Sequence, residues 1–240
     1  MEYYNQPTPP PIYGGTRTVT QQVNAVMRKV YVRMFLGMLI SAFVALGVAT
    51  SPAALQFIHG SKLVYWGMFI AMFAMAIVIP AKLNSMSTTT TMLLFFLFAA
   101  MMGATLSGIM IIYPTDAILY TFFITAGLFG VMSVYGYLTR ANLAKMGSIM
   151  MMALFGLIIA SVVNIFWAND TLDWIISFAG VLIFTGLTAW DTQQIKQIAS
   201  ANLAPQLTDK LATMGAMNLY LDFINLFLFL LRIFGGGSRN

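Results

Sequence analysis

The amino-acid sequence predicts an all-α membrane protein with seven transmembrane helices. Of its 240 residues, 60% are hydrophobic and only 8% are charged, whereas soluble domains carry about a quarter of charged residues. The apolar residues form continuous runs, and a helix needs about 20 such residues to cross the hydrocarbon layer. Because these runs do not alternate with polar residues, helices are favoured over a β-barrel, the other architecture that lipid tolerates.

Seven apolar blocks follow one another along the chain, separated by polar or turn-forming residues. The connection after the sixth block, residues 191–212, is expected to continue the sixth helix and to turn at Pro205. Small-residue spacings such as Gly103 to Ser107 and Ala126 to Gly130 permit close helix contact. The expected spans are Met34–Thr50, Leu63–Ala81, Thr91–Ile112, Ile118–Tyr137, Gly147–Trp167, Trp174–Trp190 and Thr213–Ile233.

The two chain ends are expected to lie outside these spans. The polar, proline-rich start predicts a disordered cytoplasmic tail over residues 1–25, and residues 236–240 form a short C-terminal tail. The seven-helix transmembrane domain is expected over residues 26–235. No charged-then-apolar leader with a cleavage site opens the sequence, so the first block is interpreted as a retained span.

The charge distribution predicts an orientation rather than a nucleic-acid partner. The formal net charge is +5, but the basic residues form no stripe with interleaved aromatic residues, so nucleic-acid binding is excluded. With seven spans, the positive-inside rule puts the N-terminus in the cytoplasm and the C-terminus outside. A re-entrant last block would instead add Arg232 and Arg239 to the cytoplasmic set. The basic residues expected on the cytoplasmic side are Arg17, Arg28, Lys29, Arg33, Lys82, Arg140, Lys145, Lys196 and Lys210.

Asp191 and Asp222 are the acids set within the spans, and intramembrane acids are candidates for function because their burial is costly. Asp191 ends the sixth block and Asp222 lies in the last one, so this topology brings both to the inner half of the membrane. On the last helix, Asn218, Asp222 and Asn225 form a polar stripe that is expected to face the bundle interior. Thr188 lies one turn before Asp191 on the sixth helix.

Two carboxylates held together outside bulk water cannot both ionise cheaply, so they are expected to titrate as a pair. Such a pair can act as a proton-sensitive switch, and its oxygens, with those of the neighbouring amides, suit a hard cation such as Ca²⁺. Asp191 and Asp222 are therefore the candidate metal ligands. The alternative is that each acid is neutralised by a buried hydrogen bond or a lysine and only fixes helix packing.

Enzyme and cofactor chemistry is not expected. The chain has no cysteine, and its single histidine, His59, is expected to be solvated in an outer loop. Trp190-Asp191 and Leu221-Asp222 do not match the motifs of intramembrane aspartyl proteases. The last block lacks the lysine that a retinal protein requires. The nineteen methionines fit packing better than copper ligation.

Two segments together resemble the signature of the Bax inhibitor family of transmembrane proteins. They are Gly186-Leu-Thr-Ala-Trp-Asp-Thr-Gln193 and Leu219-Tyr-Leu-Asp-Phe-Ile-Asn-Leu-Phe227. Tyr135-Gly136-Tyr137, at the end of the fourth span, and the spacing of the seven blocks extend the likeness over about residues 25–235. The sequence is most similar to the bacterial inner-membrane members.

The resemblance implies a seven-helix fold in which the last helix is central. It also implies that Asp191 and Asp222 form a hydrogen-bonded pair that acts as the pH sensor of a calcium leak. Some members carry a latch arginine at the inner end of the second span, where Lys82 is the nearest basic residue here. Other bacterial members are linked to the membrane quality-control protease, which leaves a regulatory protein without ion conduction as the alternative. The tail before residue 25 and the Lys196–Lys210 segment are the contact surfaces that this alternative needs.

Overall fold

The computed structural model describes residues 18–201 and 203–235, which form nine α-helices. Seven of these helices or helix pairs are long and apolar enough to cross a membrane, which confirms the predicted fold class. The helices are α1 (Val19–Ala49), α2 (Pro52–His59), α3 (Lys62–Ala81), α4 (Thr88–Leu106), α5 (Ile109–Ile112), α6 (Thr115–Leu138), α7 (Ala144–Trp167), α8 (Asp170–Ser200) and α9 (Pro205–Gly235).

The helix boundaries differ from the prediction in three places. α1 begins at Val19, so the predicted tail ends too late: the side chain of Thr18 caps the helix before any apolar run begins. The short helix α2 was not predicted, and the third span breaks at Ser107 before α5. The sixth helix continues to Ser200 and α9 starts at Pro205, as expected. The rest of the predicted tails, residues 1–17 and 236–240, lies outside the described residues.

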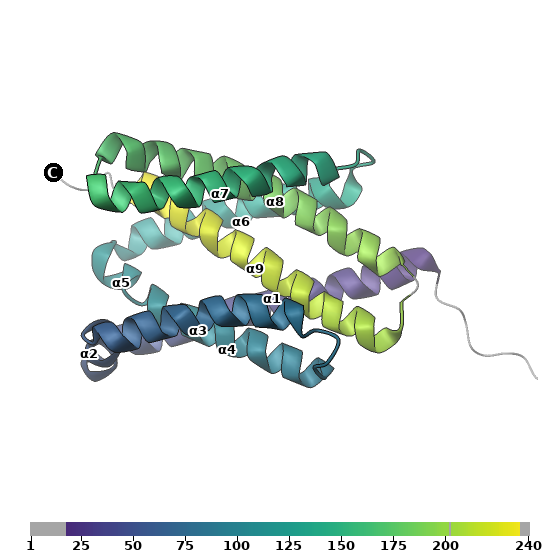
Figure 1. The fold of residues 1–240 in the computed structure, drawn as a ribbon, viewed down its shortest axis with the longest axis horizontal. Coiled ribbons are helices and arrows are strands. Elements are labelled where there is room, and N and C mark those ends of the chain that lie inside the picture. Colours follow the sequence, from purple (N-terminus) through teal and green to yellow (C-terminus); the bar gives the residue numbers. More distant parts are fainter. Residues whose placement is uncertain (1–17, 202, 236–240) are drawn as a thin grey trace, which may run out of the picture.

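The bundle has two ends of different character (Figure 1). The start of α1 and the loops α3–α4, α6–α7 and α8–α9 gather at one end, which we call the basic end because most of the basic residues lie there. α2, α5 and the α7–α8 loop lie at the opposite end. α1, α8 and α9 have 31 residues each, which at 1.5 Å per residue is about 46 Å, longer than the hydrocarbon layer of about 30 Å.

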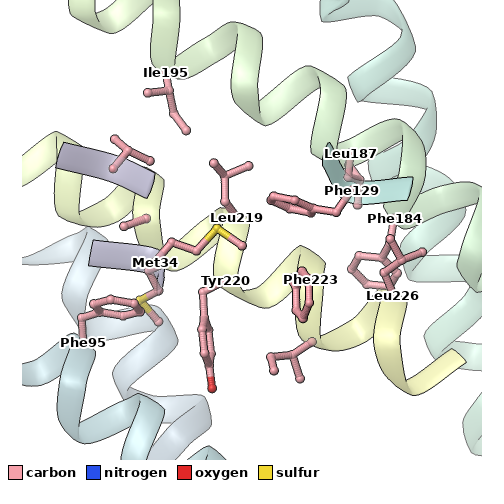
Figure 2. Packing of buried hydrophobic residues seen from close by; sticks show 14 of the residues in the cluster. Met34, Phe95, Phe129, Phe184, Leu187, Ile195, Leu219, Tyr220, Phe223 and Leu226 are labelled. Carbon is pink, nitrogen blue, oxygen red and sulfur yellow. The ribbon is translucent and has the colours of Figure 1, made fainter. Parts of the chain in front are cut away.

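The last helix is central. α9 crosses the middle of the bundle in Figure 1 and packs against α1, α4, α6 and α8. In its most apolar window 67% of the residues are buried, against 11% for α3 and 6% for α7. Figure 2 shows Tyr220 of α9 near Met34 and Phe95, while Phe223 points towards Phe129. Because α9 is so buried, its few polar residues lie inside the bundle rather than against lipid.

Close backbone approach fixes how the helices around α9 are spaced. A Cβ atom on Gly136 would lie 2.2 Å from the carbonyl oxygen of Ala189, so α6 and α8 touch through this glycine. A Cβ atom on Gly103 would lie 2.3 Å from the carbonyl oxygen of Ser41 on α1. The predicted close contact at Gly103 is therefore confirmed, whereas Gly130 has open space beside it and makes no such contact.

Candidate functional site

A cavity of about 810 Å³ runs along α9 and contains both predicted acids. Its lining reaches from Leu211 to Phe229 on α9 and includes α8 residues from Phe184 to Ile198. Its apolar walls come from α7 and from Phe73 of α3, the two helices that are least buried. We call it the acidic cavity, because Asp191 and Asp222 are the charged residues among its described lining residues.

Asp191 and Asp222 reach the cavity from neighbouring helices, α8 and α9. Asp222 is only 5% exposed, and its Oδ2 atom has no hydrogen-bond partner among the described residues. Asp191 is half-buried. Both residues line this one cavity. The structure therefore brings the two acids to one site.

A hydrogen bond between the two acids is not found among the described residues. Neither carboxylate accepts a hydrogen bond there, in contrast to the bonded pair that the resemblance implies. No lysine or arginine of the described chain forms an ion pair with either of them. A buried carboxylate without protein partners requires a proton, water or a cation to offset the cost of its charge.

The predicted polar stripe of α9 lines the same cavity. Asn218, Asp222 and Asn225 all face it, and the Nδ2 atom of Asn225 donates to the Leu221 carbonyl at 2.8 Å. The Oδ1 atom of Asn225 takes no part in that hydrogen bond. Gln194, one turn after Asp191, adds another amide that the sequence analysis did not single out. Thr188 behaves differently, because it is buried outside the lining and donates to the Phe184 carbonyl at 2.8 Å.

A tryptophan next to Asp191 fixes the rotation of α8. A Cβ atom on Gly147 of α7 would lie 2.2 Å from the Trp190 ring, so this glycine leaves the space that the indole occupies. Trp190 also lines the cavity. Because successive side chains on a helix point in fixed directions, seating Trp190 against α7 sets where Asp191 points.

Two phenylalanines line the acidic cavity on the side away from the basic end. The rings of Phe184 and Phe229 stack with their centroids 5.9 Å apart, and both line the cavity. Gly180 leaves space for the Phe229 ring, since a Cβ there would lie 2.6 Å from it. Beyond this pair, Arg232 forms an ion pair with Asp173 at 3.1 Å. We call Phe184 and Phe229 the aromatic seal.

Lys82 lies at the end of the second span, as expected, but apart from the acidic cavity, whereas His59 does not lie where the sequence suggested. Lys82 is exposed after the end of α3, is absent from the lining of the acidic cavity, and its side chain makes no hydrogen bond with the described residues. His59 is not a solvated loop residue: it ends α2, is half-buried, and its Nε2 atom lies 2.9 Å from Ser107 Oγ.

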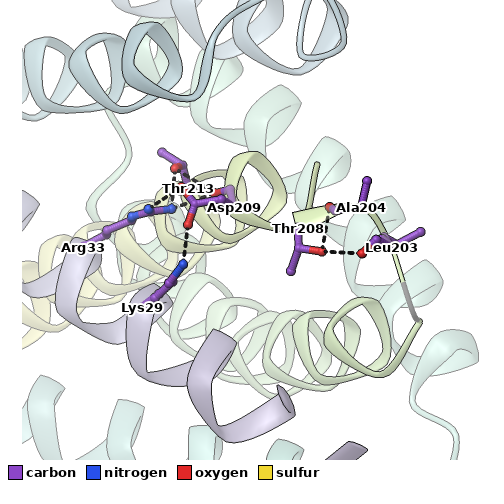
Figure 3. Close-up of polar contacts among 7 residues, drawn as sticks. All are labelled: Lys29, Arg33, Leu203, Ala204, Thr208, Asp209 and Thr213. Carbon is purple, nitrogen blue, oxygen red and sulfur yellow. Dashed lines mark hydrogen bonds and ion pairs between the residues drawn. The ribbon is translucent and has the colours of Figure 1, made fainter. Parts of the chain in front are cut away.

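A charged cluster at the basic end joins α1 to the start of α9 and was missed by the sequence analysis (Figure 3). Arg33 donates to the Asp209 carboxylate and carbonyl at 2.8 and 2.7 Å and to Thr213 Oγ1 at 2.8 Å. Lys29 forms a second ion pair with Asp209 at 2.8 Å. Lys29 and Arg33 are four residues apart and so share a helix face, which is the signal that could have indicated a common acidic partner.

The acidic cavity offers oxygen ligands but no dense cluster of charged ones among the described residues. Among the described residues, no group of three or more His, Cys, Asp or Glu side chains is placed to hold a metal ion. Ca²⁺ takes six to eight oxygens, and the cavity offers the two carboxylates with the amides of Asn218, Asn225 and Gln194. Water would have to complete such a coordination shell.

Seven apolar helices, of which the last is buried and central, with two acids in one cavity between them, define a polytopic α-helical membrane protein with an acidic site. The family described as "Inhibitor of apoptosis-promoting Bax1" matches residues 23–240, and the chain belongs to this Bax inhibitor family. The family assignment that the two signature segments predicted is thereby confirmed.

Bacterial relatives match nearly the whole chain. The Inner membrane protein YbhL of Escherichia coli is 42% identical over 211 residues, which cover 87% of this chain and 90% of the relative. An uncharacterized protein of Borreliella burgdorferi is 42% identical over 213 residues, covering 88% and 92%. One of Rickettsia prowazekii is 38% identical over 221 residues, covering 91% and 92%. The first relative is an inner-membrane protein by its name, in agreement with the apolar helices found here.

Proposed function

We propose that this protein is a pH-sensitive calcium leak whose ion path follows the acidic cavity. The observation that carries the proposal is that Asp191 and Asp222 line one cavity that follows α9 from Leu211 to Phe229. The 18 rises from Leu211 to Phe229 correspond to about 27 Å along the helix, close to the thickness of the hydrocarbon layer. The positive-inside rule favours the cytoplasm for the basic end, so Ca²⁺ leaves towards the cytoplasm there.

In this proposal, protons and Ca²⁺ compete for the same oxygen atoms. When both acids are ionised, they repel each other and attract a divalent cation, whose charge offsets their burial. When they share a proton, part of that attraction is lost and the two side chains can approach each other. Asn218 and Asn225 add neutral oxygens that can follow the ion along the helix.

The aromatic seal is the barrier that keeps the leak small. Phe184 and Phe229 offer no polar atom to an ion, so Ca²⁺ would have to lose its water there without replacement. Ion flow therefore requires the stacked rings to separate.

Calcium flux into liposomes that contain only the purified protein tests the proposal. Wild-type protein should admit Ca²⁺ at a rate that changes between pH 5 and pH 9. Asp191→Asn and Asp222→Asn should each flatten this pH dependence, because an amide does not titrate. Asp116→Asn is the matched control: it removes one negative charge from an exposed position at the start of α6 and should keep the wild-type profile. A wild-type protein without flux at any pH would refute the leak.

A regulatory role without conduction is the second candidate, and the length of three helices favours it. α1, α8 and α9 are about 16 Å longer than the hydrocarbon layer, so their polar ends can extend from the membrane as contact surfaces. The partner would be another membrane protein, such as a quality-control protease. The liposome experiment separates the two candidates, since a regulator lacks flux, and truncation of residues 1–25 would then abolish capture of the protease.

A further inference from the structure

A second cavity, of about 470 Å³, lies at the basic end between the start of α1, the loop 139–142 and the end of α8. Arg140 and Lys196 line it, and none of its described lining residues is acidic. Thr20 and Gln197 contribute further polar side chains. This basic cavity is separate from the acidic one, with which it shares no lining residue.

The loop that carries Arg140 is held in place by a side chain of α8. The Gln193 side chain accepts from the Leu143 N–H and donates to the Ala141 carbonyl, both at 2.8 Å. Arg140 itself is exposed and makes no hydrogen bond or ion pair with the described residues. Lys196 donates to the Tyr137 carbonyl at 2.7 Å, which leaves two of its three N–H groups for a ligand. Two cations therefore lie in this cavity with no acidic partner among residues 18–201 and 203–235.

An apolar groove of about 690 Å³ adjoins the basic cavity between α1 and α6. The two share Tyr137, and their linings include consecutive residues, Leu138 and Thr139, at the end of α6. Gly130 lies in this groove and has open space where a side chain would be. Ser133 also lines it; the residue is 5% exposed, and its hydroxyl is buried with no hydrogen-bond partner among the described residues.

We infer that the basic cavity and the α1/α6 groove together bind one anionic phospholipid. The phosphate lies between Arg140 and Lys196, and an acyl chain follows the groove past Gly130. Ser133 is one helical turn below Tyr137, about 6 Å deeper, at the depth of the ester groups just beneath the phosphate. Basic pockets beside membrane helices bind lipid headgroups in this manner, and the adjoining groove favours a lipid over a free phosphate.

Native mass spectrometry of the purified protein with phosphatidylglycerol or phosphatidylcholine of equal chain length tests this inference. The wild type should retain one phosphatidylglycerol molecule in preference to phosphatidylcholine. Arg140→Gln should weaken phosphatidylglycerol binding about fivefold, the effect of one basic residue near a charged lipid. Lys145→Gln removes the same charge from an exposed position in the first turn of α7, outside the cavity lining, and should leave binding unchanged.

A second pair of variants tests the acyl chain without changing any charge. Gly130→Leu fills the groove and should weaken binding of both lipids about tenfold, since displacing two buried methylenes is enough for that. Gly127→Leu is the control, because Gly127 also has open space beside it but does not line the groove.

Three results would overturn the inference. Equal losses from Arg140→Gln and Lys145→Gln would show only general attraction of anionic lipid. Unchanged binding in Gly130→Leu would exclude the groove. Inorganic phosphate or glycerol phosphate that displaces phosphatidylglycerol and raises the Tm of the wild type, but not of Arg140→Gln, would assign the cavity to a free phosphate instead.

Discussion

The charged cluster at the basic end predicts that two neighbouring basic residues contribute very unequally to stability. Arg33 and Lys29 contact the same acid, Asp209, from one face of α1. The side chain of Arg33 is 13% exposed, whereas that of Lys29 is 56% exposed. The comparison of Arg33→Gln with Lys29→Gln therefore removes one charge from the same partner in two different environments.

The expected magnitudes follow from the contacts. Arg33 makes three hydrogen bonds, to the Asp209 carboxylate, the Asp209 carbonyl and Thr213. Charge-assisted bonds contribute about 1.5–3 kcal/mol each but are not additive, so Arg33→Gln should cost about 3 kcal/mol of unfolding free energy. At 2–4 °C per kcal/mol, the Tm should fall by about 6–12 °C. Lys29→Gln removes an exposed ion pair worth at most about 1 kcal/mol, which lowers Tm by less than about 4 °C.

Thermal unfolding in detergent, followed by the fluorescence of the four tryptophans, measures both variants. Repeating it in 1 M KCl, where the Debye length is about 3 Å, should erase the Lys29 effect and leave most of the Arg33 effect. Arg33→Lys should fall between wild type and Arg33→Gln, because an ammonium cannot reproduce the planar fork. Equal losses for Arg33→Gln and Lys29→Gln at low salt would refute the argument from burial.

Three further predictions concern packing and the barrier. Gly136→Ala should lower the free energy of unfolding by about 1–3 kcal/mol, because the added Cβ would lie 2.2 Å from the Ala189 carbonyl oxygen. Gly127→Ala, where the new methyl group enters open space, should be neutral or stabilising, and thermal unfolding compares the two variants. Ser41→Ala should destabilise the protein more than Tyr220→Phe does in the same assay, because it leaves the buried Tyr220 hydroxyl without its hydrogen-bond partner at 2.7 Å. In Tyr220→Phe, the Ser41 hydroxyl still donates to the Ala99 carbonyl. Phe229→Ala should raise calcium flux in liposomes by opening the aromatic seal, whereas the exposed Phe166→Ala should not; equal flux in both variants would exclude the seal as the barrier.

The sequence was sufficient to predict the seven spans and the two intramembrane acids, because both signals depend on the free energy of transfer from water to lipid. Continuous apolar runs predicted seven helices, and a carboxylate within such a run stands out because placing its charge in lipid costs free energy. The stripe Asn218, Asp222 and Asn225 follows from helical periodicity alone, and all three residues line the cavity.

Features that depend on pairing between distant helices could not be predicted in this way. Asp209 was assigned to a connecting segment, and only the fold brings it beside Arg33, 176 residues earlier in the chain. The early start of α1 was hidden because most of residues 20–24 are polar, and the cap at Thr18 gives a weaker signal than an apolar run. Thr188 was grouped with Asp191 by spacing, but its hydroxyl bonds to its own helix instead.

The distribution of burial indicates which helices would move if the acidic cavity opens. α9 is buried over 67% of its most apolar window and packs on four helices, so displacing it would disrupt the core around Tyr220. α3 and α7 are buried over only 11% and 6% of theirs, and both contribute to the cavity wall. Because their outer faces exchange one apolar neighbour for another when they shift in lipid, their motion costs less than that of α9. The acids therefore sit on the rigid helices α8 and α9, and the walls that confine them belong to the helices that move most easily.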